Sequence, residues 1–352
     1  MVKVKNVVAV AIMFIAAGAM ASNFRAADQV YLPAAGHLGG SSGTFISDVF
    51  ISNLSSDSVS VSVIFSTGAG GTQTAFPNVI TLAGNERQEI LDIFPSKLNL
   101  ASGFGQLIFN GCKQGGNCDV NTCPNGTTTG ICPDFRDISV ESRIYSIAPG
   151  AIPATAATNG QLFSGIPWYN FVSSDTSAVG LDKIFITGLR NTGVNGTAGT
   201  YRGNIGLVNA SQFSTTTILV KLLNGPNGTQ LGSTFSQTLS PLGHTQVGLS
   251  TMFPGFTGAT ATNAYVTVEQ SNTQKTNDAD ANGCPTGCPA FFAYGSVLDN
   301  LSGDATTLEP QYLKSLTDPV FGPAAGPNPI TCIYNSQCKT TGGFKLHRAA
   351  KH

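Results

Sequence analysis

The chain has 352 residues, of which 41% are hydrophobic and 11% charged, and its formal net charge is −1 at pH 7. A disordered chain has low hydrophobicity and high net charge, and a nucleic-acid-binding surface has an excess of Lys and Arg, so this composition excludes both classes. With 41 Gly residues and abundant Ser, Thr and Asn, the sequence favours short strands joined by turns, over a length that predicts two domains.

The first 21 residues are typical of a secretory signal peptide. Lys3 and Lys5 precede an uncharged apolar run from Val7 to Ala21, which ends in the small-x-small pattern Ala19-Met20-Ala21. The run is shorter than the roughly 20 residues of a membrane helix, although a membrane anchor is the alternative. We therefore predict cleavage before Ser22 and a mature chain without a membrane span, secreted, at the cell surface or in the periplasm.

The rest of the chain contains an internal repeat. Five segments recur in the same order, at offsets of 153–159 residues. The pairs are Thr44–Asn53 with Thr200–Asn209, Val59–Phe65 with Thr217–Leu223, Leu82–Pro95 with Leu239–Pro254, Gln106–Phe109 with Tyr265–Val268, and Ile138–Ile147 with Phe291–Leu298. This pattern predicts a duplication, with copy one at residues 28–149 and copy two at residues 182–311.

Alternation of apolar and polar residues predicts strands with one buried face. Val59, Val61 and Val63 fall on one face, and Ser60 and Ser62 on the other. Each copy contains about seven such strands separated by turn signals. The predicted fold class is therefore all-β: two tandem immunoglobulin-like antiparallel β-sandwiches related by internal duplication. The segment 90–100 holds at most one helical turn, because Pro95 lies inside it.

Two segments lie outside the predicted sandwiches. Residues 150–181 form a linker with an aromatic stretch, in which we interpret Trp168 and Tyr169 as packing between the sandwiches or, alternatively, as a binding platform. Residues 312–352 form a Pro/Gly-rich, basic tail that we expect to be partly disordered.

The chain has eight Cys, an even number that favours disulfides in an exported protein. Their clustering suggests four local bridges, with a link from Cys284 or Cys288 to the tail as the alternative. The expected pairs are Cys112–Cys118, Cys123–Cys132, Cys284–Cys288 and Cys332–Cys338. Zinc is disfavoured because the first cluster lacks Cys-x-x-Cys spacing and nearby His.

Other chemical motifs are sparse. Asp278, Asp280 and Asn282 fit the first half of a calcium loop, but the bidentate Glu at position twelve is replaced by Pro289. We therefore expect no cofactor, with calcium at this loop left open against a solvated acidic hairpin tip. Residues 39–43 match G-x-S-x-G but precede a strand, so no nucleophile elbow is predicted there. His37 lies near this motif without a defined role. We interpret His244 as an exposed turn histidine.

The pattern resembles a group of secreted bacterial proteins built from a duplicated β-sandwich unit, largely without assigned function. The resemblance covers most of the mature chain and is strongest in copy two. It is carried by residues 142–145, 159–161, 186–190, 204–209, 292–300 and 303–304. It implies an extracytoplasmic all-β protein and transfers no catalytic residue.

From these observations we expect a non-enzymatic protein that serves adhesion, matrix or envelope structure. A carbohydrate-binding module is the first alternative, and an extracellular hydrolase with a scattered triad is the second. The partner is an unidentified surface, protein or glycan, and not a nucleic acid. Sparse charge and scarce His disfavour acid–base catalysis, because that chemistry needs titratable groups gathered in a cleft.

Overall fold

A computed structural model describes ten ranges of the chain, and the structural statements below refer to them. They are residues 26–40, 43–118, 134–147, 159–167, 172–173, 183–192, 197–211, 215–254, 261–271 and 290–312. Within them the chain is all-β with two four-residue helices. None of the helices in these ranges is long and apolar enough to cross a membrane. The predicted signal peptide and the tail beyond residue 312 lie outside the described residues.

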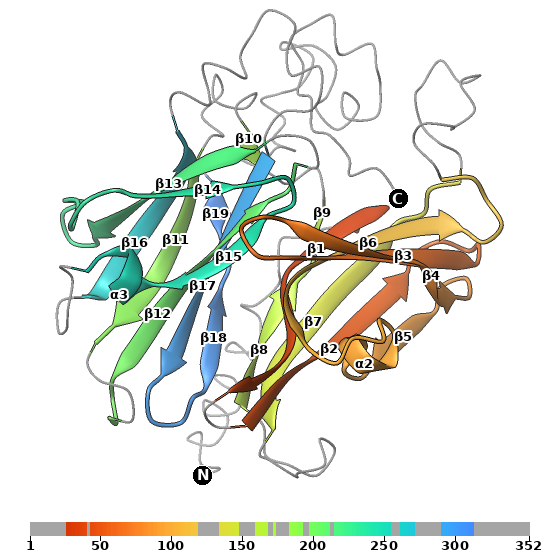
Figure 1. The fold of residues 1–352 in the computed structure, drawn as a ribbon, viewed down its shortest axis with the longest axis horizontal. Helices are drawn as coiled ribbons and strands as arrows, with labels where there is room; N and C mark the ends of the chain where they lie inside the picture. The colour runs from red at the N-terminus through yellow and green to blue at the C-terminus, as the bar shows by residue number, and fades with distance from the viewer. Residues whose placement is uncertain are drawn as a thin grey trace, which may run out of the picture.

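The first half of the chain forms a β-sandwich of two antiparallel sheets (Figure 1). Its elements are β1 (Gln29–Gly40), β2 (Gly43–Asn53), β3 (Val59–Thr67), β4 (Thr72–Leu82), β5 (Arg87–Ile90), α2 (Ile93–Ser96), β6 (Gly103–Lys113), β7 (Ile138–Ile147), β8 (Asn159–Ser164) and β9 (Ile166–Pro167). Sheet A has the order β5-β2-β7-β8, and sheet B has the order β4-β3-β6-β1-β9. The end of β1 also pairs with the start of β2, which joins the two sheets at one corner.

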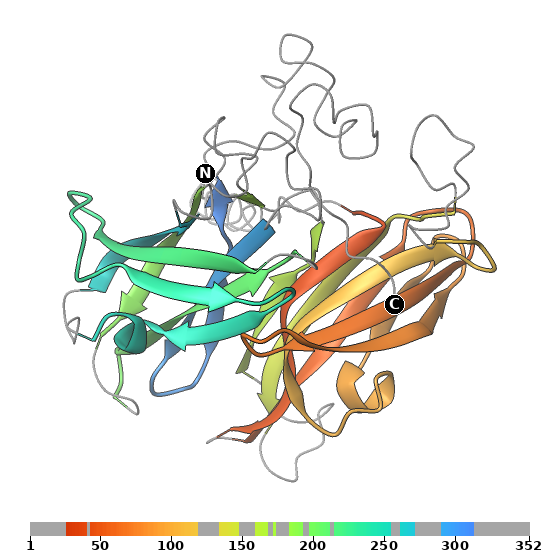
Figure 2. The ribbon, with the colours of Figure 1, turned by 45° about the horizontal axis from the view of Figure 1, so that its top comes forward.

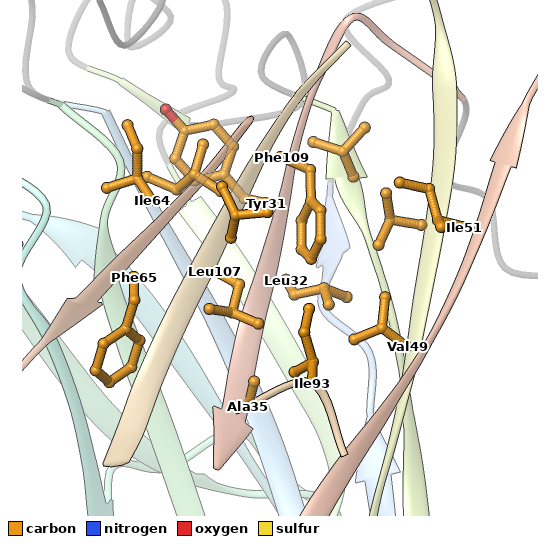
Figure 3. Close-up of a cluster of buried hydrophobic side chains, with 14 of the residues drawn as sticks. Tyr31, Leu32, Ala35, Val49, Ile51, Ile64, Phe65, Ile93, Leu107 and Phe109 are labelled. Atoms are coloured by element: carbon orange, nitrogen blue, oxygen red, sulfur yellow. The ribbon is translucent and has the colours of Figure 1, made fainter. Parts of the chain in front are cut away.

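The core between sheets A and B follows the alternation of the strands. Val59, Val61 and Val63 are fully buried, as predicted, while Ser60 and Ser62 are half-exposed on the other face. Figure 3 shows Val49 and Ile51 of β2 pointing toward side chains of the opposite sheet, Leu32 and Phe109 among them. The helical turn α2 adds Ile93 and Phe94 to this core. It holds Pro95, which is tolerated in the first turn of a helix.

The second half forms a further two-sheet β-sandwich. Its elements are β10 (Val172–Ser173), β11 (Lys183–Asn191), β12 (Tyr201–Asn209), β13 (Thr216–Asn224), β14 (Phe235–Leu239), β15 (His244–Gly248), α3 (Leu249–Met252), β16 (Ala261–Gln270), β17 (Ala290–Asp299), β18 (Ala305–Leu308) and β19 (Gln311–Tyr312). Sheet C has the order β15-β12-β17-β18, with β10 also pairing β17, and sheet D has the order β14-β13-β16-β11-β19.

The order of strand pairing is the same in both sandwiches. Sheet C repeats sheet A, and sheet D repeats sheet B. Positions that occupy the same place in the pairing register are called counterparts below. Asn53 and Asn209 illustrate the match: each side-chain oxygen accepts the amide two residues on, Ser55 and Ser211, at 2.9 Å. Each side-chain amide also donates to the turn before a later strand of the same sheet, β5 for Asn53 and β15 for Asn209.

The two sandwiches lie side by side (Figure 2). Each has a hydrophobic core of its own, and the buried cluster of the first extends across the contact to the second. Val208, Phe292 and Tyr294, on the outer face of sheet C, belong to the same buried cluster as Tyr31 and Phe109. The turns 68–71 and 240–243 touch so closely that a Cβ added at Gly71 would lie 2.0 Å from the carbonyl oxygen of Pro241. The shared cluster holds the two sandwiches together, because burial of apolar surface is the dominant favourable term in association.

The segment predicted as a linker contributes strands. β8 pairs with β7, and β9 pairs with β1, so residues 159–167 extend the first sandwich. The side chain of Gln161 on β8 accepts hydrogen bonds from Ser296 at 3.0 Å and Thr307 at 3.4 Å in the second sandwich. Ser164 donates to Glu309 at 3.1 Å. The strand β8 therefore lies along the seam between the two sandwiches.

Candidate functional site

The outer face of sheet A carries a connected group of ionisable side chains. We call His37, Asp48, Asp92, Arg143 and Tyr145 the polar cluster. Asp48 and Arg143 face each other in the β2–β7 register. His37 comes from the end of β1, and Asp92 immediately precedes α2. Three strands and one turn thus bring together residues that are up to 108 positions apart in the sequence.

Hydrogen bonds order the cluster into one network. His37 Nδ1 lies 2.7 Å from Asp92 Oδ2, and Asp48 Oδ1 accepts the backbone amide of Asp92 at 2.9 Å. The hydroxyl of Tyr145 donates to Asp48, and the Arg143 guanidinium lies 4.6 Å from the centroid of the Tyr145 ring. Because His37 uses Nδ1 for this bond, Nε2 is the ring nitrogen that can serve a ligand.

Burial shifts the acid–base equilibria of the cluster. It raises the pKa of Asp92, an effect that the hydrogen bond from His37 opposes. Burial also raises the pKa of Tyr145, and the Asp48 carboxylate adds to that effect, so the phenol stays neutral and donates. The cluster nevertheless stays accessible, since the side chains of His37 and Asp92 are 25% and 20% exposed.

Asp92 has an unusual backbone conformation. Its φ of 40° lies in the left-handed region, which a non-glycine residue adopts at a cost of about 1–3 kcal/mol. It occupies the N-cap position of α2 but makes no side-chain capping bond there. Oδ2 of the carboxylate binds His37 Nδ1 at 2.7 Å. Strain of this kind is held by surrounding structure and is concentrated at functional sites.

The second sandwich lacks this chemistry. The counterparts of Asp48, Arg143 and Tyr145 are Asn204, Ser296 and Leu298, and α3 is preceded by Gly248. Among the described residues, the polar cluster therefore occurs in the first sandwich only. The sequence drew attention to His37 only through its proximity to the G-x-S-x-G match, and Asp48, Asp92, Arg143 and Tyr145 were not predicted as site residues. A charged residue inside the otherwise uncharged strand segment Thr44–Asn53 was the signal available for Asp48.

Two hydroxyl groups near the His37–Asp92 pair, those of Ser47 and Tyr145, already have hydrogen-bond partners. Ser47 is fully buried; its Oγ donates to the Gly36 carbonyl at 2.9 Å and accepts the Gly36 amide at 2.7 Å. Tyr145 is bound to Asp48. The described part of the cluster therefore supplies a base and an orienting carboxylate, but both of these hydroxyls are engaged.

The predicted site residues are placed as follows. Trp168, Tyr169 and the calcium candidates Asp278, Asp280 and Asn282 lie outside the described residues, as do the six cysteines from Cys123 onward. Cys112 and Cys118 are joined by a disulfide that closes the start of the loop after β6. Among the described residues, no group of three or more His, Cys, Asp or Glu side chains is arranged to hold a metal ion.

The interpretation of His244 as an exposed turn residue is wrong. Its side chain is 2% exposed and lies between the sandwiches, where Nε2 is 3.2 Å from the Tyr294 hydroxyl and the ring contacts Phe104 edge-on. Burial lowers the pKa of His244 to about 4, so it is neutral at pH 7. Gly243, a turn residue, suggested that His244 is exposed. The turn lies in the contact between the two sandwiches, which buries the histidine.

Comparisons with known proteins find only weak likeness. No protein-family model matches the chain, and no curated protein matches it. Among solved structures, the N-terminal CBM22-1–CBM22-2 tandem of Xyn10C from Paenibacillus barcinonensis covers 80% of this chain and 86% of its own, at 10% identity and a TM-score of 0.19. A Pleurotus ostreatus lectin in complex with GalNAc covers 83% and 86%, at 8% identity and a TM-score of 0.15. Scores this low identify neither a shared fold nor a function.

Proposed function

We propose that this protein is a non-catalytic, extracellular β-sandwich protein that attaches to a polysaccharide surface through the polar cluster. The proposal joins adhesion and carbohydrate binding, and the polar cluster is the observation that carries it. The proposal also includes the duplication of an immunoglobulin-like unit, which the shared pairing order of the two sandwiches supports. Export to an oxidising compartment is supported by the Cys112–Cys118 disulfide.

The chemistry of the cluster suits a ligand rich in hydroxyl groups. A sugar hydroxyl both donates and accepts, so it pairs equally well with a carboxylate and with a guanidinium. The cluster offers both kinds of partner, Asp92 and Arg143, in positions fixed by hydrogen bonds and ring contact. Preorganised side chains lose less conformational entropy on binding. Leu162, which is 52% exposed and pairs with Arg143 in the β7–β8 register, adds an apolar contact for a sugar ring.

The test is retention on insoluble polysaccharides. The purified protein is mixed with cellulose, xylan, chitin or peptidoglycan, and the bound fraction is measured as a function of concentration. We expect binding to at least one of them and a loss of about tenfold or more in affinity for Arg143→Ala, as is typical when a charged hydrogen-bonding partner is removed. Arg190→Ala is the matched control, because Arg190 makes the same kind of ring contact with Tyr201 in the second sandwich, at 5.0 Å. Absence of wild-type binding to all four would end the proposal.

A hydrolase is the second candidate, and the His37–Asp92 pair favours it. A carboxylate that orients a histidine through Nδ1 is the base-and-orienter half of a hydrolytic triad. The proposal of a non-catalytic protein is contradicted if ester or glycoside hydrolysis by the wild type is abolished in His37→Ala while the far-UV circular dichroism stays unchanged.

A further inference from the structure

One corner of the second sandwich, formed by residues 209–211 and 240–243, takes part in the contact between the two sandwiches. The carbonyl oxygen of Leu242 accepts hydrogen bonds from Ser66 Oγ and Gln106 Nε2 on the outer face of sheet B, each at 2.7 Å. The carbonyl oxygen of Ala210 accepts from the Tyr31 hydroxyl at 3.4 Å. Leu242 and Ala210 are 0% and 1% exposed, so this corner is completely covered.

The first sandwich has the same corner, formed by residues 53–55 and 83–86, and there it is exposed. Asn85 is the counterpart of Leu242: both have left-handed φ values, 59° and 54°, and both donate their amide to the other half of the corner. Leu54 is the counterpart of Ala210, and its side chain is 56% exposed. A large apolar side chain thus stands open at the place where the second sandwich makes its docking contact.

The face that receives such a corner also occurs twice. The outer face of sheet D is the counterpart of the outer face of sheet B. Leu223 and Tyr265 stand where sheet B has Ser66 and Gln106, and Phe185 stands where sheet B has Tyr31. The sheet B residues are buried, whereas Leu223, Tyr265 and Phe185 are half-buried.

Charged residues mark the sheet D face. Lys183 and Lys221 both bind Glu269, with Lys183 Nζ at 3.3 Å from Glu269 Oε2. Two lysines and one glutamate give these positions a net charge of +1. The counterparts on sheet B are Gln29, Ile64 and Asn110, all neutral.

The exposed corner and the adjoining outer face of sheet A have the opposite sign. Glu86, Arg87, Glu89 and Glu141 give a net charge of −2. Their counterparts around the covered corner are neutral at pH 7: Gly243, His244, Gln246 and Tyr294. The exposed corner with its adjoining face of sheet A and the outer face of sheet D therefore carry opposite net charges. The corresponding surfaces in the contact inside the chain are neutral. Complementary charge selects partners and orients their encounter.

We infer that this protein associates with further copies of itself, head to tail, by docking the exposed corner of one copy against the outer face of sheet D of the next. The contact uses the same places on the two sandwiches as the one inside the chain, with apolar side chains and opposite charges where the internal contact has hydrogen bonds. It is heterologous, because different surfaces of the two copies meet, so it extends into a chain of copies rather than closing a two-fold dimer.

This association goes beyond polysaccharide attachment and does not depend on it. Asp48 of the polar cluster lies at the middle of β2, and Leu54 lies just past its end, six residues and about 20 Å away. A variant at Leu54 therefore leaves the polar cluster intact. Failure of either proposal can be observed while the other holds.

The experiment is sedimentation velocity on the secreted chain at about 0.2 and about 50 µM, a range that brackets a Kd of a few micromolar, the weak end expected for such an interface. We expect the wild type to sediment as larger species at the higher concentration, and less so as salt is raised, because salt screens exposed charges. Leu54→Asp places a charge in the exposed corner and should prevent it from docking. Leu223→Asp does the same to the outer face of sheet D. Leu301→Asp is the matched control, since Leu301 is 63% exposed in a turn after β17, outside both surfaces.

Mixing the variants gives the sharpest outcome. Leu54→Asp and Leu223→Asp each remain single copies alone, but a mixture forms a complex of two copies that cannot grow, because each variant keeps one intact surface. A wild type that stays a single copy at both concentrations overturns the inference. So does Leu54→Asp that assembles like the wild type, or a mixture of folded variants that forms no complex. If Leu223→Asp does not fold, the result for Leu54→Asp against Leu301→Asp decides.

Discussion

Gln106 of the first sandwich donates a hydrogen bond from Nε2 to the carbonyl oxygen of Leu242 in the second, at 2.7 Å, and both residues are fully buried. Leu242 has a left-handed backbone, which is unfavourable for a leucine, whereas Asn at the counterpart position 85 tolerates it. The docking contact thus holds a turn that its own sequence does not favour. We therefore expect the described sandwiches to unfold as one cooperative unit.

Ser66 and Gln106 share this carbonyl, so their removal should be non-additive. Ser66→Ala or Gln106→Ala alone should lower the free energy of unfolding by about 1 kcal/mol, because the Leu242 oxygen keeps one partner. The double variant should cost more than the sum, since it leaves a buried acceptor unsatisfied. Urea unfolding of all four proteins measures this cycle. Strict additivity would mean that the two bonds do not act on one shared group.

The buried His244 should make the protein acid-sensitive. Its folded-state pKa of about 4 lies below the ordinary value of 6.5, so the unfolded chain binds the proton first as pH falls. Its contribution to stability is complete above pH 6.5 and is lost progressively down to pH 4, by an amount on the order of 3 kcal/mol. Urea unfolding at pH 7.5 and pH 4.5 checks this. His244→Gln should show a smaller loss, because glutamine does not titrate, and an equal loss in both proteins would contradict the assignment.

The Cys112–Cys118 disulfide should stabilise the protein modestly. It closes a short loop, with a sequence separation of 6, and the entropy lost by the unfolded chain corresponds to about 2 kcal/mol. Replacing both cysteines by alanine should lower the midpoint of urea unfolding with little change in its slope. Peptide mapping without reduction should recover the linked pair. Recovery of Cys112 or Cys118 as a free thiol in the secreted protein would contradict the disulfide.

The Tyr294 ring should be sensitive to any side chain at position 206. A Cβ added at Gly206 would lie 2.0 Å from the ring, which is itself packed against Phe163 across the seam. Gly206→Ala should therefore destabilise the protein by about 2–3 kcal/mol, as overpacking does. Gly39→Ala is the control, because an added Cβ there meets no atom within 4 Å. Equal melting temperatures for Gly206→Ala and Gly39→Ala would contradict this prediction, because they would show that the Tyr294 ring can move aside.

The sequence predicted the parts of the fold that depend on local pattern. Alternation fixed the buried face of β3, and the repeated segments fall on strands that pair in the same order in both sandwiches. The limit of at most one helical turn in residues 90–100 agrees with the four residues of α2. The polar cluster was not, because His37 and Asp92 are 55 residues apart and no spacing rule connects them. The expected exposure of His244 was wrong because the residues that cover it, such as Phe104, are distant in the sequence.

What the sequence determined by itself was the all-β class and which face of each strand is buried, because those properties follow from neighbouring residues with a period of two. Only the tertiary structure decided which outer sheet faces are covered. Ser66 and Gln106 have the polar character of surface residues, yet they are buried because the second sandwich docks on them. Leu54 is apolar yet exposed. Burial at these positions depends on contacts between segments more than a hundred residues apart, which local pattern does not encode.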